Sequence, residues 1–186
     1  MIGDDTVDRV SDRNIQLEGE GHTIWYGIEG ARIEGLPAML TKYLNAHPAP
    51  TTLVIHVGAN DLFRNGTLYY RHCVRKIIQA IGYMLPDTRI IWFDVSLRAF
   101  YYGEEKPGGG KRFVHALNAY AHAMCNSIPN LRFIKHTHFA SCDHSLYMSD
   151  GARLSDKGNE QFLADLSEGL SFLNSHPGKM GYPLGR

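Results

Sequence analysis

Residues 51–61, TTLVIHVGAND, constrain the fold of this chain more than any other stretch. The apolar, largely β-branched run over 53–57 predicts a strand buried on both faces, as is typical of parallel sheets. The run ends at 58–61 in GAND, so it delivers polar side chains to the carboxyl edge of a sheet, where open α/β folds bind their ligands. The same four residues also favour a plain turn. Only their partners elsewhere in the chain decide between the two interpretations.

Strand-like and helix-like segments alternate along the chain, which predicts βαβ units, a mostly parallel central sheet and a three-layer α/β/α sandwich. A chain of 186 residues is long enough for one domain with a sizeable core. We place this domain at residues 1–175 and expect the Gly- and Pro-rich residues 176–186 to form a loose tail. Strands are predicted at 22–26, 53–57, 89–95 and 131–135, with a stub at 1–2, and helices at 5–13, 36–44, 69–85, 112–127 and after an N-cap at Ser155.

The charge balance gives no support to nucleic-acid or membrane binding. Lysine plus arginine number 19 and aspartate plus glutamate also number 19, so the chain has no basic surplus to neutralise phosphates. No apolar run reaches transmembrane length, and the first residues lack the basic-then-apolar layout of a signal peptide. We therefore expect a soluble, cytoplasmic protein.

The cysteines and histidines indicate neither a cofactor nor a metal. Cys73, Cys125 and Cys142 are widely spaced and odd in number, which fits free thiols in a reducing compartment. The two closest histidines, His136 and His138, fall at a predicted strand end, and no Cys/His cluster has the spacing of a zinc site.

Polar groups follow the predicted strands at four places. Asp5 follows the first strand, Gly30 the second and Asn60 the central one, while Asp150 and Arg153 precede the last helix. Simpler interpretations exist for two of them. Asp5 has the chemistry of a helix N-cap, and Asn60 that of a side chain that only bridges its own loop.

Taken together, these blocks resemble a known family. GDD at 3–5, the glycine turn at 27–30, GAND at 58–61 and SDGARLSDKGNEQFLADL at 149–166 look like the four motif blocks of the SGNH/GDSL hydrolases, in the right order. The resemblance extends over nearly the whole chain and is closest to esterase-like domains carried by vertebrate retroelements and genes derived from them. It implies the flavodoxin-like SGNH hydrolase fold.

The resemblance also implies a role for each of these positions. Gly30 and Asn60 match the backbone and side-chain donors of the family's oxyanion hole, and Asp150 matches the acid that orients the catalytic base. The family's nucleophilic serine is replaced by Asp5, and its catalytic histidine is replaced by Arg153.

These two replacements remove the family's covalent chemistry. An arginine stays protonated at any ordinary pH, so Arg153 cannot accept a proton. Asp5 would place its own negative charge near the donors meant for a developing oxyanion, so we expect the hole to be plugged. As a hypothesis, Arg153 lies between Asp150 and Asp5 in an Asp–Arg–Asp ion network, and its removal would cost several kcal/mol.

Three functions stay open at this point. The first is a domain that has lost ester hydrolysis and binds a small acyl or carboxylate ligand in the cleft, or a protein partner. The second is a weak esterase for small acyl or acetyl esters, with Asp5 or His144 as base. The third is a structural module inherited from a retroelement protein. His56, on the central strand, fits a buried histidine better than a catalyst.

Overall fold

The computed structural model describes residues 1–12, 15–17, 21–61, 67–100, 108–139 and 143–182. Six strands form one sheet in the order β2-β1-β3-β4-β5-β6, and every neighbouring pair is parallel. The predicted α/β class with a parallel central sheet is thus confirmed. The strands are β1 (Ile2–Gly3), β2 (Tyr26–Gly27), β3 (Thr52–His56), β4 (Arg89–Phe93), β5 (Leu131–Ile134) and β6 (Gly181–Tyr182). The α-helices are α1 (Asp5–Ser11), α2 (Leu36–Ala46), α3 (Thr67–Met84), α4 (Gly109–Met124) and α5 (Asp156–Ser175), with short 3₁₀ turns η1 (Ile33–Gly35), η2 (Ala59–Asp61) and η3 (His144–Leu146).

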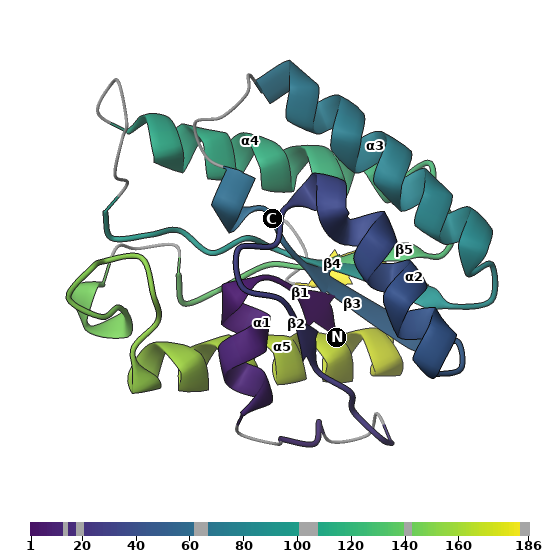
Figure 1. Ribbon diagram of the computed structural model, residues 1–186, viewed down its shortest axis with the longest axis horizontal. Coiled ribbons are helices and arrows are strands. Elements are labelled where there is room, and N and C mark those ends of the chain that lie inside the picture. The colour runs from purple at the N-terminus through teal and green to yellow at the C-terminus, as the bar shows by residue number, and fades with distance from the viewer. Residues whose placement is uncertain (13–14, 18–20, 62–66, 101–107, 140–142, 183–186) are drawn as a thin grey trace.

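Helices cover both faces of the sheet, which gives the three layers (Figure 1). Because side chains alternate along a strand, Leu53 and Ile55 of β3 pack on one face against α2, α3 and α4. Val54, together with Ile91 and Phe93 of β4, packs on the other face against α5. Both faces of β3 and β4 are therefore buried, as the apolar residues at 53–55 and 57 predict for β3.

The first strand is a two-residue stub, so α1 begins almost at the start of the chain. β1 still pairs on both sides, with β2 and with β3, and this fixes where Asp4 and Asp5 leave the sheet. On the next strand, Gly27 lies directly against the backbone of α1: a Cβ on Gly27 would stand 2.1 Å from the amide nitrogen of Asp8. The close packing of α1 on β2 thus depends on a missing side chain.

Two predicted boundaries differ from the structure. The strand predicted at 22–26 is reduced to β2 at Tyr26–Gly27, because the segment before it bonds locally through the side chains of Gln16 and Thr23. Part of the expected loose tail is ordered, since Gly181–Tyr182 forms β6 beside β5. Residues 183–186 lie outside the described residues. Ser155 caps α5 as predicted, accepting a hydrogen bond from the Gly158 amide at 3.1 Å.

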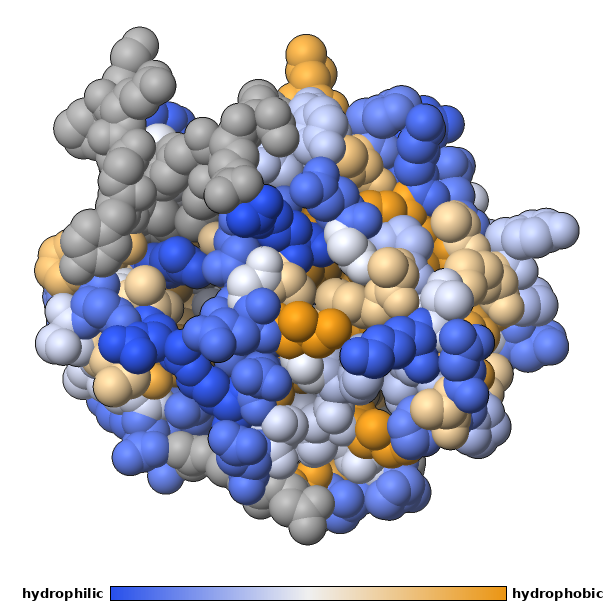
Figure 2. Space-filling view, in the orientation of Figure 1, coloured by the Kyte–Doolittle hydropathy of each residue, from blue (hydrophilic) through white to orange (hydrophobic). Residues whose placement is uncertain are grey.

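The surface in Figure 2 shows hydrophobic residues in small, separate groups among polar ones on the face that it presents. Within the described part of the chain, no helix combines the length and apolarity that crossing a membrane requires.

Replacing Gly27 by alanine should destabilise the protein by about 1–3 kcal/mol, because the new methyl group meets backbone atoms of α1 that cannot move aside like a flexible side chain. Urea unfolding of the two proteins measures the difference. Gly35→Ala is the matched control: nothing lies within 4 Å of a Cβ there, so its midpoint should stay close to that of the wild type. Equal effects of the two substitutions would contradict this account of α1 packing.

Candidate functional site

The candidate site lies at the carboxyl edge of the sheet, where the chain direction across the sheet reverses. From β1 the chain runs outward to β2 and then returns to the other side of β1 as β3. Such a reversal opens a crevice between the ends of the two central strands, which is where open α/β sheets bind ligands. Asp4 and Asp5 follow β1, and Asn60 follows β3, so all three residues lie at this edge of the sheet.

Asp4, and not Asp5, is the N-cap of α1. Its carboxylate accepts a hydrogen bond from the Thr6 amide at 3.3 Å, and its side chain is almost completely buried. Burial raises the pKa of Asp4 to about 7, although the Thr6 amide favours the charged form. Asp5, the first residue of α1, therefore does not cap the helix, and its carboxylate can make other contacts.

The Asp5 carboxylate contacts both donors that the sequence pattern singles out. Its Oδ2 accepts a hydrogen bond from the Gly30 amide at 3.2 Å and a very short one from the Asn60 side-chain amide. The same Asn60 nitrogen also donates to the Ala31 carbonyl at 3.2 Å, which fixes the orientation of the amide. The structure therefore brings Asp5, Gly30 and Asn60 together around one carboxylate oxygen.

The two loops that carry these donors are held by Asp61. Asp61 is buried, and its Oδ2 accepts a hydrogen bond from the Ile33 amide at 3.1 Å, which ties the loop after β3 to the loop after β2. The Tyr70 hydroxyl donates to the Asp61 carbonyl at 2.5 Å from α3. Gly30 adopts a φ of 71°, a conformation that suits glycine and that turns its amide toward Asp5.

Asp150 and Arg153 form a second polar unit before α5. The Asp150 carboxylate accepts hydrogen bonds from the backbone amides of Ala152 and Arg153, each at 2.9 Å, and forms an ion pair with the Arg153 guanidinium. Partial burial works to raise the pKa of Asp150, but these hydrogen bonds and the arginine outweigh it and hold the pKa at about 2. The loop joins the segment after β4 through the Ala99 amide, which donates to the Gly151 carbonyl at 2.9 Å.

Only half of the predicted Asp–Arg–Asp network is present. Arg153 pairs with Asp150, but the structure contains no ion pair between Arg153 and Asp5, both of which lie in its described part. The Asp5 carboxylate is directed at Gly30 and Asn60 instead. The side chains of Arg153 and Asp150 are 51% and 29% exposed, so the expectation of two buried carboxylates bridged by arginine is wrong.

In the described part of the chain, no carboxylate orients His144, the substitute base considered from the sequence. It lies exposed in η3, with its ring 5.2 Å from the ring of Phe100. The neighbouring Asp143 uses its carboxylate to cap the Ser145 amide at 2.9 Å and to approach Lys157. Nothing in the described structure therefore positions His144 as a general base.

His56 is buried, as predicted. It is 1% exposed and lies among the rings of Phe93, His136 and Phe162. Burial lowers its pKa to about 3, so His56 is a neutral core residue at ordinary pH.

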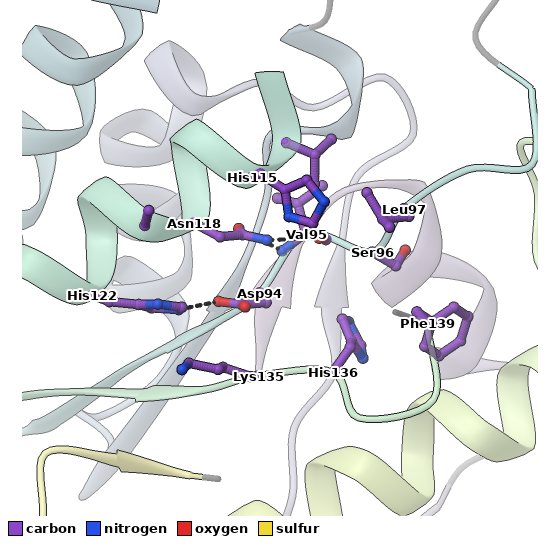
Figure 3. Close-up of a pocket in the computed structure, with 12 residues that line it drawn as sticks. Asp94, Val95, Ser96, Leu97, His115, Asn118, His122, Lys135, His136 and Phe139 are labelled. Carbon is purple, nitrogen blue, oxygen red and sulfur yellow. Dashed lines mark hydrogen bonds and ion pairs between the residues drawn. The ribbon is translucent and has the colours of Figure 1, made fainter. Parts of the chain in front are cut away.

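Sequence reasoning missed three contacts between carboxylates and imidazoles. Asp94, just after β4, contacts His122 of α4 at 2.5 Å (Figure 3). The fully buried Asp165 of α5 contacts His136 at 3.0 Å and His138 at 2.6 Å. One signal was available: Asp165 lies among apolar residues on the inward face of α5, where an acid requires a partner. The identity of that partner depends on the fold.

Among the residues that the structure describes, no group of three or more histidines, cysteines or acids has the arrangement of a metal site. Cys73 and Cys125 are free thiols. Cys142 and the aromatic residues Tyr101 and Tyr102 lie outside the described residues.

No protein-family model matches the chain, and no curated protein does. Solved structures do match. A member of the lipolytic G-D-S-L family from Veillonella parvula has a TM-score of 0.68 at 15% identity, over 90% of this chain and 94% of its own. A lipase/acylhydrolase from Enterococcus faecalis has 0.60 at 19% identity, over 100% and 98%. A family 3 carbohydrate esterase from Clostridium thermocellum has 0.63 at 18% identity, over 93% and 87%. The fold is thus the SGNH/GDSL hydrolase fold.

Replacing Asp4 by asparagine should make the protein less sensitive to a rise in pH from acidic to neutral values. The pKa of Asp4 is about 7 in the folded protein against 3.8 for a free side chain, so ionisation costs wild-type stability as pH rises from about 4 to about 7. Asparagine can still cap α1 but cannot ionise. The stability of Asp4→Asn relative to the wild type should therefore rise by roughly 2–3 kcal/mol between about pH 5 and pH 8. Urea unfolding at both pH values measures this, and Asp12→Asn, at an exposed position, should show no such change.

Replacing Arg153 by alanine should cost only about 0–1 kcal/mol, because its ion pair with Asp150 is exposed to water. As a contrast, Asp165→Ala removes a fully buried acid and leaves its histidine partners unpaired, with an expected cost of about 3–5 kcal/mol. Denaturant unfolding of both variants tests the comparison. A large loss of unfolding free energy in Arg153→Ala would instead support the buried Asp–Arg–Asp network that the sequence alone suggested.

Proposed function

We propose that this SGNH/GDSL-fold domain has lost ester hydrolysis and serves as a binding or interaction module. One observation carries the proposal: the Asp5 carboxylate already accepts hydrogen bonds from the Gly30 amide and the Asn60 side chain. If these two groups correspond to an oxyanion hole, its donors are occupied by the chain's own negative charge. A developing oxyanion would have to displace that charge before it gained any stabilisation.

The positions for covalent chemistry support the same conclusion. Asp5 stands where the family resemblance places a serine, and its carboxylate is a poor nucleophile toward an ester without further assistance. Arg153 stands at the position of the base and cannot take up a proton. Asp150 retains its place, but its carboxylate orients a guanidinium instead of an imidazole.

A protein that binds at this edge of the sheet would contact exposed residues near the Asp150–Arg153 pair. Phe100 and Met148 are 48% and 47% exposed, and Arg153 and His144 are exposed beside them. This mixture favours a protein segment with apolar and acidic side chains over a small acyl or carboxylate ligand, which would compete with Asp5 for the same donors. The proposal includes a retroelement-derived origin, from the sequence resemblance, and a reducing, cytoplasmic location, which fits the thiols of Cys73 and Cys125.

Hydrolysis of p-nitrophenyl acetate tests the loss of activity. The wild type should not exceed the rate of the uncatalysed reaction, because it lacks both a nucleophile and a base. The double variant Asp5→Ser/Arg153→His restores both groups and releases the Gly30 and Asn60 donors, so it should show turnover above the wild type.

The matched control is Asp5→Ala/Arg153→His, which opens the site and carries the same histidine but has no hydroxyl to acylate. Its rate should stay at that of the wild type. Wild-type turnover that disappears in Asp5→Ala or His144→Ala would refute the proposal and favour a weak esterase with a rearranged site.

A further inference from the structure

The charged residues of this neutral chain are divided between the two faces of the sheet. The three helices on one face, α2, α3 and α4, carry six lysines or arginines and no aspartate or glutamate. The two helices on the other face, α1 and α5, carry six acids and two cationic residues, Arg9 and Lys157. The net charge of zero therefore describes neither face, and the helices of the layer that contains α3 are cationic.

One exposed stripe of side chains runs along α3. Figure 1 shows this helix along the upper outline of the molecule, and it packs beside both α2 and α4. The residues of the stripe recur at helical spacing and so lie on one side of the helix: they are Leu68, His72, Arg75, Lys76, Gln79 and Tyr83. All six are exposed, and Leu68 and Tyr83, at the two ends, are 78% and 90% exposed. We call this set the α3 stripe.

The cations of the α3 stripe have no acidic partner in the described part of the chain. Neither Arg75 nor Lys76 forms an ion pair there. Arg71, one turn before Arg75, lies over the Tyr120 ring of α4, with its guanidinium carbon 5.7 Å from the ring centre. Like charges four residues apart on a helix repel each other, so Arg71 and Arg75 disfavour the helix in the free protein. An anionic surface against the stripe would offset that repulsion.

Exposed apolar side chains accompany these cations. Of the seven large hydrophobic side chains that the described structure exposes, four belong to α3, namely Leu68, Tyr69, Tyr83 and Met84. The Tyr69 hydroxyl donates a hydrogen bond to Glu34 at 2.9 Å, whereas Leu68 and Tyr83 project from the ends of the stripe. Lysine and arginine beside leucine and tyrosine are typical of helices that lie in the headgroup region of a membrane.

The shape and composition of the stripe favour a membrane over other anionic partners. The exposed side of α3 is a convex ridge, so a folded acidic protein would need a groove that matches it, whereas a bilayer adapts to projecting side chains. Nucleic acid would pair with Arg75 and Lys76, but it offers no apolar interior to Leu68. Anionic lipid offers phosphates to the cations and an acyl boundary to the apolar ends.

We propose that the α3 stripe binds peripherally to membranes that contain anionic lipid. Arg75 and Lys76 contact the lipid phosphates, and Leu68 and Tyr83 insert at the boundary between headgroups and acyl chains. The acids of α1 and α5 face away from the bilayer, so the division of charge across the sheet orients the protein as it approaches. This surface is separate from the candidate site at the strand ends, and the proposal does not depend on the loss of ester hydrolysis.

Cosedimentation of the full chain with sucrose-loaded vesicles tests the proposal. The protein should sediment with vesicles of equimolar phosphatidylserine and phosphatidylcholine and stay in solution with vesicles of phosphatidylcholine alone. Binding should weaken as the salt concentration rises, because salt screens the attraction between the cations of the stripe and the headgroups. A fluorescein-labelled single-stranded oligothymidylate provides the comparison with nucleic acid and should show no saturable rise in anisotropy.

Two matched charge reversals separate the stripe from the net charge of the chain. Arg75→Glu/Lys76→Glu should lower the affinity for the anionic vesicles by about tenfold or more. Lys157→Glu/Lys179→Glu changes the net charge by the same amount at exposed positions in α5 and just after it. This second variant should keep its affinity within about threefold of the wild type.

A third variant tests the apolar ends of the stripe. Leu68→Ser/Tyr83→Ser keeps every cation, and because both side chains are exposed, its urea unfolding midpoint should stay close to that of the wild type. Its affinity for the anionic vesicles should nevertheless fall by about tenfold. Met148→Ser, which alters a large exposed apolar side chain outside α3, is the matched control and should keep the wild-type affinity.

Each of four results would overturn the proposal. These are no sedimentation with the anionic vesicles, equal sedimentation with phosphatidylcholine alone, equal losses in the two charge reversals, and full affinity in Leu68→Ser/Tyr83→Ser. A saturable oligothymidylate complex that Arg75→Glu/Lys76→Glu abolishes, without any binding to vesicles, would assign the stripe to nucleic acid instead.

Discussion

The structure depends on one constraint: each acid that the fold draws away from water at the carboxyl edge of the sheet requires hydrogen-bond donors. Asp61 obtains one from the Ile33 amide, Asp94 lies against His122, and Asp165 has three donors. Asp5 obtains its donors from Gly30 and Asn60, which lie on two other loops. These bonds join segments distant in sequence, so the acids fix the loops around the strand ends as much as the apolar core fixes the layers.

Much of the fold is predictable because it depends on local patterns. The apolar run at 53–57 identifies a strand buried on both faces, and helical spacing identifies α2, α3, α4 and α5 within a few residues. The edge strands are not predictable in this way. β6 has two residues, carries no alternation and exists only because β5 offers an unpaired edge. Its pairing partner is set by tertiary structure, and the sequence around it resembles a loose tail.

In the candidate site, too, only the features that depend on local sequence patterns were predictable. The strand ends put Asp5, Gly30 and Asn60 at one edge of the sheet, and the family resemblance implied that the three lie together. The sequence did not show which carboxylate forms an ion pair with Arg153. Asp150 is three residues away and pairs locally, whereas Asp5 has two better donors elsewhere. The imidazole partners of Asp94 and Asp165 depend on the packing of α4 and of the chain after β5, which no spacing in the sequence encodes.

The contacts of Asp5 also bear on the proposed loss of ester hydrolysis. A set of donors aimed at a transient negative charge is unsatisfied for most of an enzyme's cycle, and such preorganisation commonly lowers stability. In this chain the Asp5 carboxylate supplies a permanent negative charge to the Gly30 amide and the Asn60 side chain. A carboxylate oxygen can satisfy these two donors as an oxyanion would. In the proposed function, an aspartate in place of a nucleophile is therefore compatible with the fold, and it gives the loops that carry Gly30 and Asn60 a permanent hydrogen-bonded connection.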